Sequence, residues 1–565
     1  MNDHHLNELN LLLAHDDDGA PVLETGLSDQ AASRAERPAD DLLNFWDESE
    51  LADDLEAQRW GVIAPEGPEG DRLLDLIRPL IDARKEAQDG HEVLILRAPA
   101  RLLPEDASRW NKDVFKKAAK PTDLPRYQLI LGDLHQVPLS IQQTQGVDGF
   151  VGRLCFHDER GYEEYVQKVL RWEKMRSEDE ARAKCFTVHD GTAATMIGYR
   201  SLIKSGIELL QEQQYEVQDT GDRDDPSVDE FLELVRSAEP TMLFSVSHGA
   251  GAPRGGWKSH NEQRDRQGAM SFGRAGKLAA GDVGEDPFLP GGIWFMLACY
   301  GAGTPDQSAY EPWLRQLKQV GQFGGQAESV LAALPKGEAP PFIAALPQRV
   351  LAKPNGPLAI MGHVDLAWTY SFEERDSGIV QKRPQKFMEV IRTALMGDRV
   401  GMSFRELLRY LINTNHEVTD LYHAAAQKGG SDMGARLGHL WMLRQDLAGY
   451  ILLGDPAVRL PVAQKRKQRR AAKLASKMRD LGTLASRPAE ARGPAPGAFS
   501  GAEESAAPAP KLPIEIDKLE EAIGHLITGE LAPKKVAEQY GVDRADLERF
   551  KEIYTRAGRA ALGVK

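Results

Sequence analysis

Two short apolar runs in the chain end in side chains that can do chemistry. The run Leu243–Ser247 leads directly into His248, and the run Ile293–Ala298 leads directly into Cys299. A thiolate is a nucleophile, and a neighbouring imidazole can take and return its proton, provided that the thiol is partly exposed. The two residues therefore predict nucleophilic catalysis, in which Cys299 attacks a carbonyl carbon and His248 protonates the leaving amine.

Glycines follow both of these residues, at positions 249, 251, 301 and 303. Glycine permits the close approach of a substrate backbone and the positive-φ turns that such an approach needs. We expect the backbone N–H groups of Gly249 and Cys299 to bind the oxyanion that develops during the attack. A donor of this kind is typically worth about 10²–10³ in rate.

Other interpretations of the same residues are weaker. A single buried cysteine is usually a small core residue, but here histidine, cysteine and glycines occur together at matching strand ends. The Gly-Ala-Gly sequences do not complete a dinucleotide fingerprint, because Pro253 and Pro305 interrupt the helix that should follow. The sequence contains neither a Walker A motif nor a zinc-ligand cluster. The sequence thus shows no motif for a nucleotide cofactor or a zinc site.

The elements that must position the pair are short, continuous apolar runs that alternate with amphipathic stretches. Runs of this kind are typical of parallel strands buried on both faces, with helices covering the sheet. The expected strands are 93–96, 127–131, 185–188, 242–247, 293–299, 358–361 and 450–453, and the clearest expected helices are 163–173, 199–213 and 228–238. Ligands bind beyond the carboxyl ends of such strands, which is where His248 and Cys299 lie.

Composition narrows the classes of protein that the chain can be. A formal net charge of −15 disfavours a general affinity for nucleic acid or anionic membranes, and no apolar stretch is long enough to span a bilayer. Three cysteines, Cys155, Cys185 and Cys299, make no disulfide framework and fit a reducing compartment. The N-terminus has no secretory signal pattern. A cytoplasmic location is the resulting expectation.

Changes in composition divide the chain into five parts. We expect an acidic, flexible or weakly helical leader at 1–57, an N-terminal α/β subdomain at 58–180 and the catalytic domain at 181–463. A basic helix and an Ala/Pro/Gly-rich linker follow at 464–512, and a small all-α module at 513–565. Within the catalytic domain, the glycine- and charge-rich segment 251–292 lacks clear strand or helix patterns, and we expect it to border the site.

Several motifs resemble those of the caspase-like clan of cysteine peptidases, and within it the gingipain-like and bacterial caspase-like branch. The histidine precedes the cysteine by 51 positions, close to the roughly 50 of caspases. The resemblance covers roughly 124–460. Its motifs are Tyr127–Asp133 with Val137-Pro138, Gly149–Arg153, Ser247–Gly249, Ala298–Gly301, Gly362–Trp368 and Leu453–Pro456.

This resemblance implies a fold, an activity and further site residues. The fold would be a caspase-like three-layer sheet of mainly parallel strands with helices on both faces. The activity would be cleavage of a polypeptide substrate by Cys299 and His248 without a cofactor. Trp368 would wall the primary specificity pocket, where Asp365 and Asp190 are candidate acids for a basic substrate side chain. A core tryptophan and solvated turn aspartates are the alternatives. By the same resemblance, Asp133, Arg153 and Asp455 would fix turns.

Two other functions stay open at the level of sequence. The caspase-like part could be a catalytically silent scaffold. The module 513–565 has helix-turn-helix spacing, but its last helix mixes acidic residues with basic ones, which is poor for binding phosphates. A protein partner for this module is therefore expected at least as much as DNA, and a nucleic-acid partner is weakly supported. No membrane partner is expected.

Overall fold

The computed structural model describes most of the chain between residues 52 and 462, together with parts of the first 28 residues. The described ranges are 8–9, 11–23, 27–28, 52–100, 102–175, 180–220, 227–236, 240–319, 326–337, 339–376, 379–428 and 434–462. The chain divides into two compact units, 1–46 with 58–463, and 47–57 with 464–565. Of the second unit only 52–57 are described, so the predicted basic helix, linker and C-terminal module lie outside the described residues.

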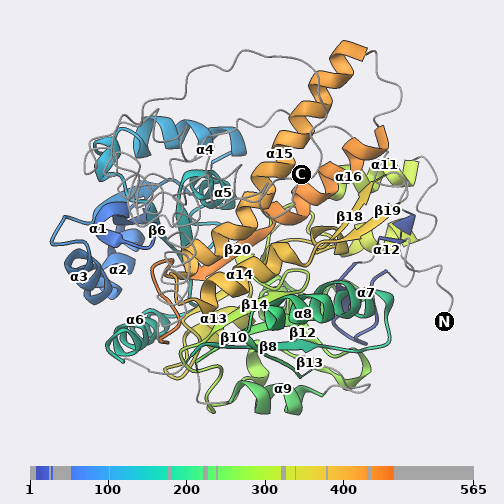
Figure 1. The fold of residues 1–565 in the computed structure, drawn as a ribbon, viewed down its shortest axis with the longest axis horizontal. Helices are drawn as coiled ribbons and strands as arrows, with labels where there is room; N and C mark the ends of the chain where they lie inside the picture. Colours follow the sequence, from blue (N-terminus) through green and yellow to red (C-terminus); the bar gives the residue numbers. More distant parts are fainter. Residues whose placement is uncertain are drawn as a thin grey trace, which may run out of the picture. The chain divides into compact units, whose positions relative to one another are not determined.

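A ten-stranded sheet forms the centre of the first unit (Figure 1). Every neighbouring pair of its strands is parallel except β17 and β20, which are antiparallel. In order across the sheet, the strands are β5 (Leu94–Ala98), β4 (Trp60–Pro65), β6 (Tyr127–Leu131), β7 (Phe150–Leu154), β20 (Tyr450–Gly454), β17 (Ala359–His363), β14 (Ile293–Leu297), β10 (Thr241–Val246), β8 (Arg182–Thr187) and β9 (Glu216–Asp219). The seven expected strands are all present, which confirms an α/β fold with a mainly parallel sheet.

Three more strands of this sheet, β4, β7 and β9, were not expected, and the sequence explains why. Strand β9 is short and polar, with Val217 as its one buried residue. In β4 and β7, glycine, proline or a buried arginine interrupts the apolar run, so neither segment shows the continuous pattern of a buried strand. Arg153 in β7 is fully buried because backbone and side-chain oxygens surround its guanidinium. It donates to Gln142 Oε1 at 2.8 Å and to the carbonyl oxygens of Gly132, Asp133 and Val137 at 2.8–3.1 Å. Its predicted role in fixing a turn is confirmed.

Helices pack against both faces of the sheet at β10 and β14, the strands that lead to His248 and Cys299. On one face, Phe387 of α14 (Gln385–Leu395) packs against Phe244 of β10 and Phe295 of β14. On the other, Phe231 of α9 (Val228–Val235) packs against Trp294 of β14. Strand residues therefore alternate between two apolar layers, and His248 and Cys299 follow strands that are held on both sides.

The remaining helices include several that begin where local signals favour a start. Asp158 caps α6 by accepting a hydrogen bond from Gly161 N at 3.0 Å, and Pro68 occupies the first turn of α2. The remaining helices are α1 (Leu55–Gln58), α2 (Pro68–Leu76), α3 (Arg78–Ala87), α4 (Pro104–Trp110), α5 (Leu139–Asp148), α6 (Glu159–Lys174), α7 (Ala193–Ile197), α8 (Lys204–Glu212), α10 (His260–Arg266), α11 (Glu311–Gln319), α12 (Gln326–Ala333), α13 (Ala345–Leu351), α15 (Val400–Lys428) and α16 (Gly434–Ala448).

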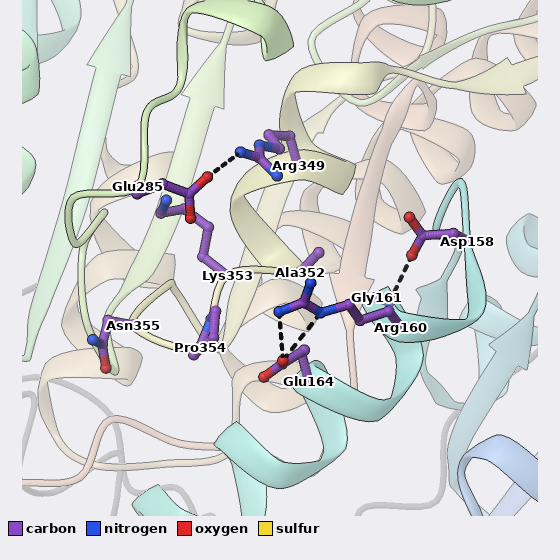
Figure 2. A pocket seen from close by; sticks show the side chains of 10 residues that line it. All are labelled: Asp158, Arg160, Gly161, Glu164, Glu285, Arg349, Ala352, Lys353, Pro354 and Asn355. Atoms are coloured by element: carbon purple, nitrogen blue, oxygen red, sulfur yellow. Dashed lines mark hydrogen bonds and ion pairs between the residues drawn. The ribbon is translucent and has the colours of Figure 1, made fainter.

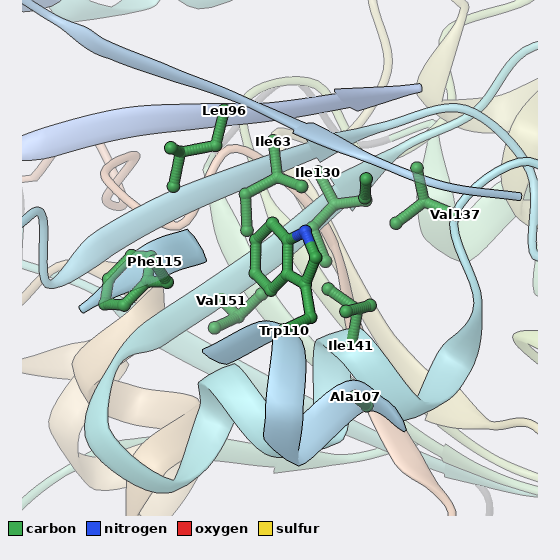
Figure 3. Close-up of a cluster of buried hydrophobic side chains, with 10 residues drawn as sticks. Ile63, Leu96, Ala107, Trp110, Phe115, Ile130, Val137, Ile141 and Val151 are labelled. Carbon is green, nitrogen blue, oxygen red and sulfur yellow. The ribbon is translucent and has the colours of Figure 1, made fainter. Parts of the chain in front are cut away.

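An apolar cluster fastens the N-terminal part of the sheet to its helices. Figure 3 shows Trp110 of α4 and Ile141 of α5 lying over the strand residues Ile63, Ile130 and Val151. The indole N–H of this tryptophan donates to a backbone carbonyl at 3.1 Å, so its polar atom is satisfied at the edge of the cluster. This part of the chain therefore has an apolar core of its own.

Small sheets complete the described structure. A four-stranded sheet has the order β13 (Lys277–Leu278), β12 (Met270–Ser271), β11 (His248–Gly251) and β2 (Leu13–His15). The two-stranded sheets pair β1 (Glu8–Leu9) with β3 (Leu27–Ser28), β15 (Gly303–Thr304) with β16 (Phe342–Ile343), and β18 (Glu373–Asp376) with β19 (Ile379–Lys382). The four-stranded sheet matters most for function, because its strand β11 begins at the predicted catalytic histidine.

Candidate active site

The register of two neighbouring strands brings His248 and Cys299 to the same edge of the sheet. Strands β10 and β14 are parallel, and Val246 lies opposite Leu297. His248 comes two residues after Val246, and Cys299 comes two residues after Leu297. The N–H of Ser247 also donates to the carbonyl oxygen of Leu297 at 3.2 Å, which holds the two strand ends together. The sequence prediction that these residues lie at adjacent strand ends is thus met by the geometry.

Gly249 is needed for this close approach of the two strand ends. A Cβ atom at this position would lie 1.8 Å from the carbonyl oxygen of Cys299, so only glycine fits. Positive φ, however, is not the reason for the glycines around the site. The residue with left-handed backbone is the buried Tyr300, at φ 57°, while the glycines at 249, 251, 301 and 303 have no positive φ. The expectation that glycines supply these turns was wrong. They supply room instead.

The imidazole of His248 is oriented by a chain of hydroxyl and carboxylate groups. Its Nε2 lies 2.9 Å from Thr192 Oγ1, and that hydroxyl donates to Asp190 Oδ1 at 2.7 Å. Asp190 Oδ2 lies 3.5 Å from the same imidazole nitrogen. A hydroxyl that donates to the carboxylate accepts from Nε2–H, which leaves Nδ1 as the basic nitrogen. Among the described residues, Nδ1 has no hydrogen-bond partner.

Asp190 and His248 meet at a reversal of strand order. Asp190 follows β8 and His248 follows β10, and the chain goes from β8 outward to β9 before it returns to β10. Ligand sites of open α/β sheets lie outside the carboxyl ends of strands at such reversals. Burial lowers the pKa of His248, while the Asp190 carboxylate acts in the opposite direction. The imidazole is therefore neutral near pH 7 and can accept a proton.

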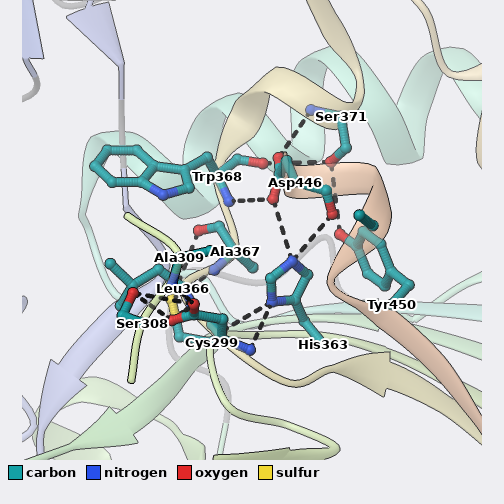
Figure 4. A network of polar contacts seen from close by, with 12 residues as sticks. Cys299, Ser308, Ala309, His363, Leu366, Ala367, Trp368, Ser371, Asp446 and Tyr450 are labelled. Atoms are coloured by element: carbon teal, nitrogen blue, oxygen red, sulfur yellow. Dashed lines mark hydrogen bonds and ion pairs between the residues drawn. The ribbon is translucent and has the colours of Figure 1, made fainter. Parts of the chain in front are cut away.

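The thiol of Cys299 is fully buried, although the sequence prediction asked for partial exposure. Its Sγ accepts a hydrogen bond from Ala367 N at 3.1 Å and lies 3.6 Å from Ala367 O (Figure 4). Burial raises the pKa of this thiol well above its ordinary value, and the hydrogen bond with Ala367 only partly opposes that effect. The buried group is thus a thiol at neutral pH rather than a thiolate.

Residues 11–14 of the predicted leader cover this thiol. Leu11, Leu12, Leu13 and Ala14 are each buried, and β2 pairs in parallel with β11, with Leu13 opposite Gly249. The carbonyl oxygen of Leu12 accepts hydrogen bonds from the N–H groups of both Gly249, at 2.9 Å, and Cys299, at 3.2 Å. These are the two donors that the sequence prediction assigned to an oxyanion. The sequence interpretation of 1–57 did not anticipate this strand.

The carboxylate of Asp365 is held by its own neighbours. It accepts hydrogen bonds from Ser308 Oγ at 2.8 and 3.0 Å, from Ala309 N at 2.8 Å and from Leu366 N at 2.8 Å. Asp190, likewise, accepts from Thr192 and Thr195. Both oxygens of Asp365 are thus hydrogen-bonded within the protein. The Asp190 carboxylate is bonded through Oδ1, while its buried Oδ2 has no hydrogen-bond partner among the described residues and lies 3.5 Å from His248 Nε2.

Trp368 lies beside the thiol with its side chain in an aromatic cluster. The indole is fully buried, and its ring centroid lies 5.9 Å from those of both Tyr310 and Trp313. Its backbone N–H donates to Asp446 Oδ1 at 2.9 Å, and the residue forms an antiparallel bridge with Leu11. The backbone of this segment therefore borders the covered thiol, while the indole itself lies in the core.

Asp446 was missed by the sequence prediction. It accepts backbone hydrogen bonds from Trp368 and from Ser371, and burial raises its pKa to about 8. Its carbonyl oxygen lies 3.0 Å from His363 Nε2 (Figure 4). No motif marks this aspartate in helix α16, so only the three-dimensional structure reveals that it fixes the segment beside Cys299. His363 is buried and bonded within the same network, as expected of a structural histidine.

The segment 251–292 borders the site through β12. Ser271 lies opposite His248 in the pairing of β12 with β11. The segment is more regular than expected, because it contains α10, β12 and β13. Asp133, from a motif far away in the sequence, fixes this region by accepting hydrogen bonds from Arg264 at 2.7 Å and from Ile343 N at 2.7 Å. Its predicted structural role is confirmed.

A hollow of about 290 Å³ elsewhere in the molecule has a different character. It lies between α6 and α13, and its charged side chains pair with one another (Figure 2). Arg349 lies 3.0 Å from Glu285, and Arg160 lies 3.4 Å from Glu164. Neither His248 nor Cys299 lines it. Within the described ranges no three His, Cys, Asp or Glu side chains gather as metal ligands do, and none of the described helices is both long and apolar enough to cross a membrane.

Burial of Asp365 predicts a pH-dependent stability. Burial raises its pKa to about 6 from an ordinary 3.8. The folded protein then holds this proton more tightly than the unfolded chain, so the contribution to stability is full below pH 4 and is lost as pH rises through 6. We expect the stability of the wild type relative to Asp365→Asn to fall by about 1 kcal/mol between pH 5 and 7.5.

Urea unfolding of both proteins at the two pH values measures this change. Asp306 is an exposed aspartate of the neighbouring loop, so Asp306→Asn is the matched control and should follow the wild type at both pH values. A wild-type stability that rises relative to Asp365→Asn over the same interval would contradict the prediction.

Comparison with known proteins leaves the site to be argued from its own contacts. No family model matches the chain, and no curated protein matches it. A search of solved structures finds the Arg-specific cysteine proteinase gingipain R (RgpB), 13% identical over 72% of this chain and 78% of the other, with a TM-score of 0.40. It also finds a complex of the pro- and mature domains of RgpB from Porphyromonas gingivalis, 14% identical over 71% and 79%, with a TM-score of 0.38.

A third solved structure, described only as a protease, is 11% identical over 71% of this chain and 78% of the other, with a TM-score of 0.40. The structure search thus returns gingipain, a member of the branch that the motifs resemble. Because the TM-scores do not exceed 0.40, the proposals below rest on the contacts of the chain itself.

Proposed function

We propose that the chain is a cysteine endopeptidase, with Cys299 as nucleophile and His248 as general acid and base. The observation that carries this proposal is the convergence of two backbone N–H groups on one carbonyl oxygen beside the thiol. Gly249 N and Cys299 N donate to Leu12 O at 2.9 and 3.2 Å. Two N–H donors that meet at one oxygen beside a nucleophile are what an acyl-transfer site requires.

The proposed reaction transfers the acyl group of a peptide bond to sulfur and then to water. The thiol gives its proton to His248, and Sγ attacks the carbonyl carbon, whose oxygen becomes an oxyanion held by the two N–H groups. His248 then gives the proton to the leaving amine as the carbon–nitrogen bond breaks. Water, with its proton taken by His248, hydrolyses the thioester and frees the thiol. No cofactor enters any of these steps.

Two neighbours of the imidazole support this role for the histidine. Thr192 and Asp190 hold Nε2 in the hydrogen-bonded chain described above. We assign Nδ1 to the proton transfer, since Nε2 is engaged in that chain. Asp190 is then a positioning residue, which acts through Thr192. Trp368 and Asp365 would contribute through the backbone of their segment, where Ala367 offers a carbonyl oxygen to a polypeptide substrate.

Replacement of either catalytic residue tests the proposal. In the opened Asp16→Ala chain described below, on fluorogenic peptides with Leu, Arg, Lys or Asp before the scissile bond, we expect Cys299→Ala to abolish hydrolysis and His248→Ala to lower it by about 10²–10⁴-fold. Cys185→Ala is the matched control, because this thiol is buried within β8 and should not affect turnover.

The proposal fails if hydrolysis does not depend on Cys299, including in a chain whose site has been opened as described below. That result would favour the catalytically silent scaffold, for which the full burial of both catalytic side chains is the supporting observation.

A further inference from the structure

The backbone of Leu12 lies across the site as the backbone of a bound substrate would. Its carbonyl oxygen accepts from both proposed oxyanion donors, and its N–H donates to Ala367 O at 3.3 Å. Leu11 forms an antiparallel bridge with Trp368, and Leu13 lies opposite Gly249 in β11. The residues before and after Leu12 are therefore both paired with protein backbone. This pairing fixes the direction in which the segment runs through the site.

The direction of this segment identifies which residue occupies which position. A substrate residue whose carbonyl oxygen fills the oxyanion site is the residue on the N-terminal side of the bond to be cleaved. Leu12 holds that position, and the bond from Leu12 to Leu13 lies where the scissile bond would lie. Gly251 makes room for the following residue, because a Cβ there would lie 2.8 Å from Leu13 Cδ1.

The side chain in this position is aliphatic and fully buried. Leu12 has no exposed surface, which is favourable only in an apolar environment. Of the two acids that could have bound a basic side chain, Asp365 is engaged with Ser308, and Asp190 is held by Thr192 and Thr195 beside the His248 imidazole. The occupant of the site thus indicates a preference for an aliphatic residue.

Charged residues that follow Leu12 anchor the segment. The carboxylate of Asp16 is buried and lies 2.6 Å from Arg266, and it also forms an ion pair with Lys277. His15 Nδ1 lies 2.8 Å from Ala252 O, and Asp18 lies 3.2 Å from Arg254. These partners all belong to 251–292, the segment that borders the site. The acidic residues are therefore a docking element.

We propose that residues 11–15 occupy the substrate cleft as a substrate mimic, with Leu12 in the position of the residue that precedes the scissile bond. The chain is then latent until this segment is displaced, and the opened site prefers peptides with leucine at that position. This inference rests on the proposed peptidase function. It adds the class of substrate and the means by which access to the site is controlled.

Two variants of the full chain open the site by different routes. Leu12→Asp places a charge in a fully buried position, and Asp16→Ala removes the anchor without altering the residue beside the thiol. Asp17→Ala is the matched control, because Asp17 is the neighbour of Asp16 in the sequence and its side chain is exposed. Thermal unfolding checks that each variant is folded. If Leu12→Asp does not fold, Asp16→Ala still provides the test.

The first measurement is the rate at which iodoacetamide alkylates Cys299, followed by peptide mass mapping. We expect Leu12→Asp and Asp16→Ala to react roughly 10- to 100-fold faster than the wild type and Asp17→Ala, because the first buries a charge and the second loses a charge-assisted contact. Equal rates in all four proteins would overturn the inference, because the segment would then not cover the thiol.

The second measurement is hydrolysis of peptides with Leu, Arg or Asp before the scissile bond. We expect the opened variants to cleave the leucine peptide at least roughly tenfold faster than either other peptide. A preference for arginine or aspartate would overturn the assignment of Leu12. Rapid alkylation without any Cys299-dependent hydrolysis would leave the cover established and remove the peptidase function, so the two failures are distinguishable.

Discussion

The variant Gly249→Ala is expected to lose peptide hydrolysis by about 10²-fold or more, because it displaces both oxyanion donors. A Cβ at this position would lie 1.8 Å from Cys299 O and 2.8 Å from Cys299 C, both backbone atoms that cannot rotate away. The strand ends after β10 and β14 must then separate. Overpacking of this severity is also expected to lower the free energy of unfolding by about 3 kcal/mol or more.

The same substitution at Gly255 provides the control. A Cβ there meets no atom within 4 Å, and the backbone has no positive φ. Gly255→Ala is therefore expected to match the parent protein in urea unfolding and in turnover. Both alanine variants are best measured in the opened Asp16→Ala background, where hydrolysis is observable. A Gly249→Ala variant with the parent's turnover would show that the strand ends do not form the oxyanion site.

The variant Arg84→Met is expected to destabilise the protein by about 3–5 kcal/mol, the usual cost of leaving a buried charge unpaired. Arg84 is buried in α3 and donates to Asp455 Oδ2 at 2.8 Å and to Glu173 at 2.6 and 3.0 Å. Asp455 also accepts from Trp60 Nε1 at 2.9 Å. The Asp455 carboxylate, which follows β20, thus joins β4 and α3, which are distant from it in the sequence. The predicted structural role of Asp455 is confirmed.

An exposed arginine of the same helix is the comparison. Arg78 lies 3.5 Å from Asp75, and both side chains are more than half exposed. A pair of this kind contributes little, so Arg78→Met is expected to change the free energy of unfolding by about 0–1 kcal/mol. Urea unfolding of both variants measures the difference. Equal effects of the two substitutions would mean that the buried network around Asp455 does not hold the fold together.

Local sequence patterns predicted the strands and helices that are determined by their own residues. The strands that carry His248 and Cys299 are continuous apolar runs, and parallel pairing brings their carboxyl ends to one edge. Helix α9 begins after a capping serine, Ser227, close to where its periodicity begins. Strands β4 and β7 were missed because glycine, proline or arginine interrupts their apolar runs. In the folded protein, contacts with distant residues stabilise these strands, as the hydrogen bonds of Arg153 do in β7.

The features missed at the site depend on contacts between residues that are distant in sequence. Leu12 belongs to a short leucine run close to three aspartates, which is typical of a polar leader. The strand that follows it, β2, nevertheless pairs with β11, which lies more than two hundred residues away in the sequence. Thr192 and Asp446 carry no motif and are recognised only by what they touch. The predicted partial exposure of Cys299 was wrong for the same reason, since Leu12 covers a thiol that local sequence leaves open.

Covalent capture of the nucleophile tests the central claim most directly. A peptidyl acyloxymethyl ketone with leucine as its last residue is added to the full chain carrying Asp16→Ala, and the adduct is located by mass mapping. We expect modification at Cys299 and none at Cys155 or Cys185. The reaction should be slower in the wild type and lost when His248→Ala is added. If Cys299 in the opened chain reacts with iodoacetamide but never with the peptidyl reagent, this is not a peptidase site.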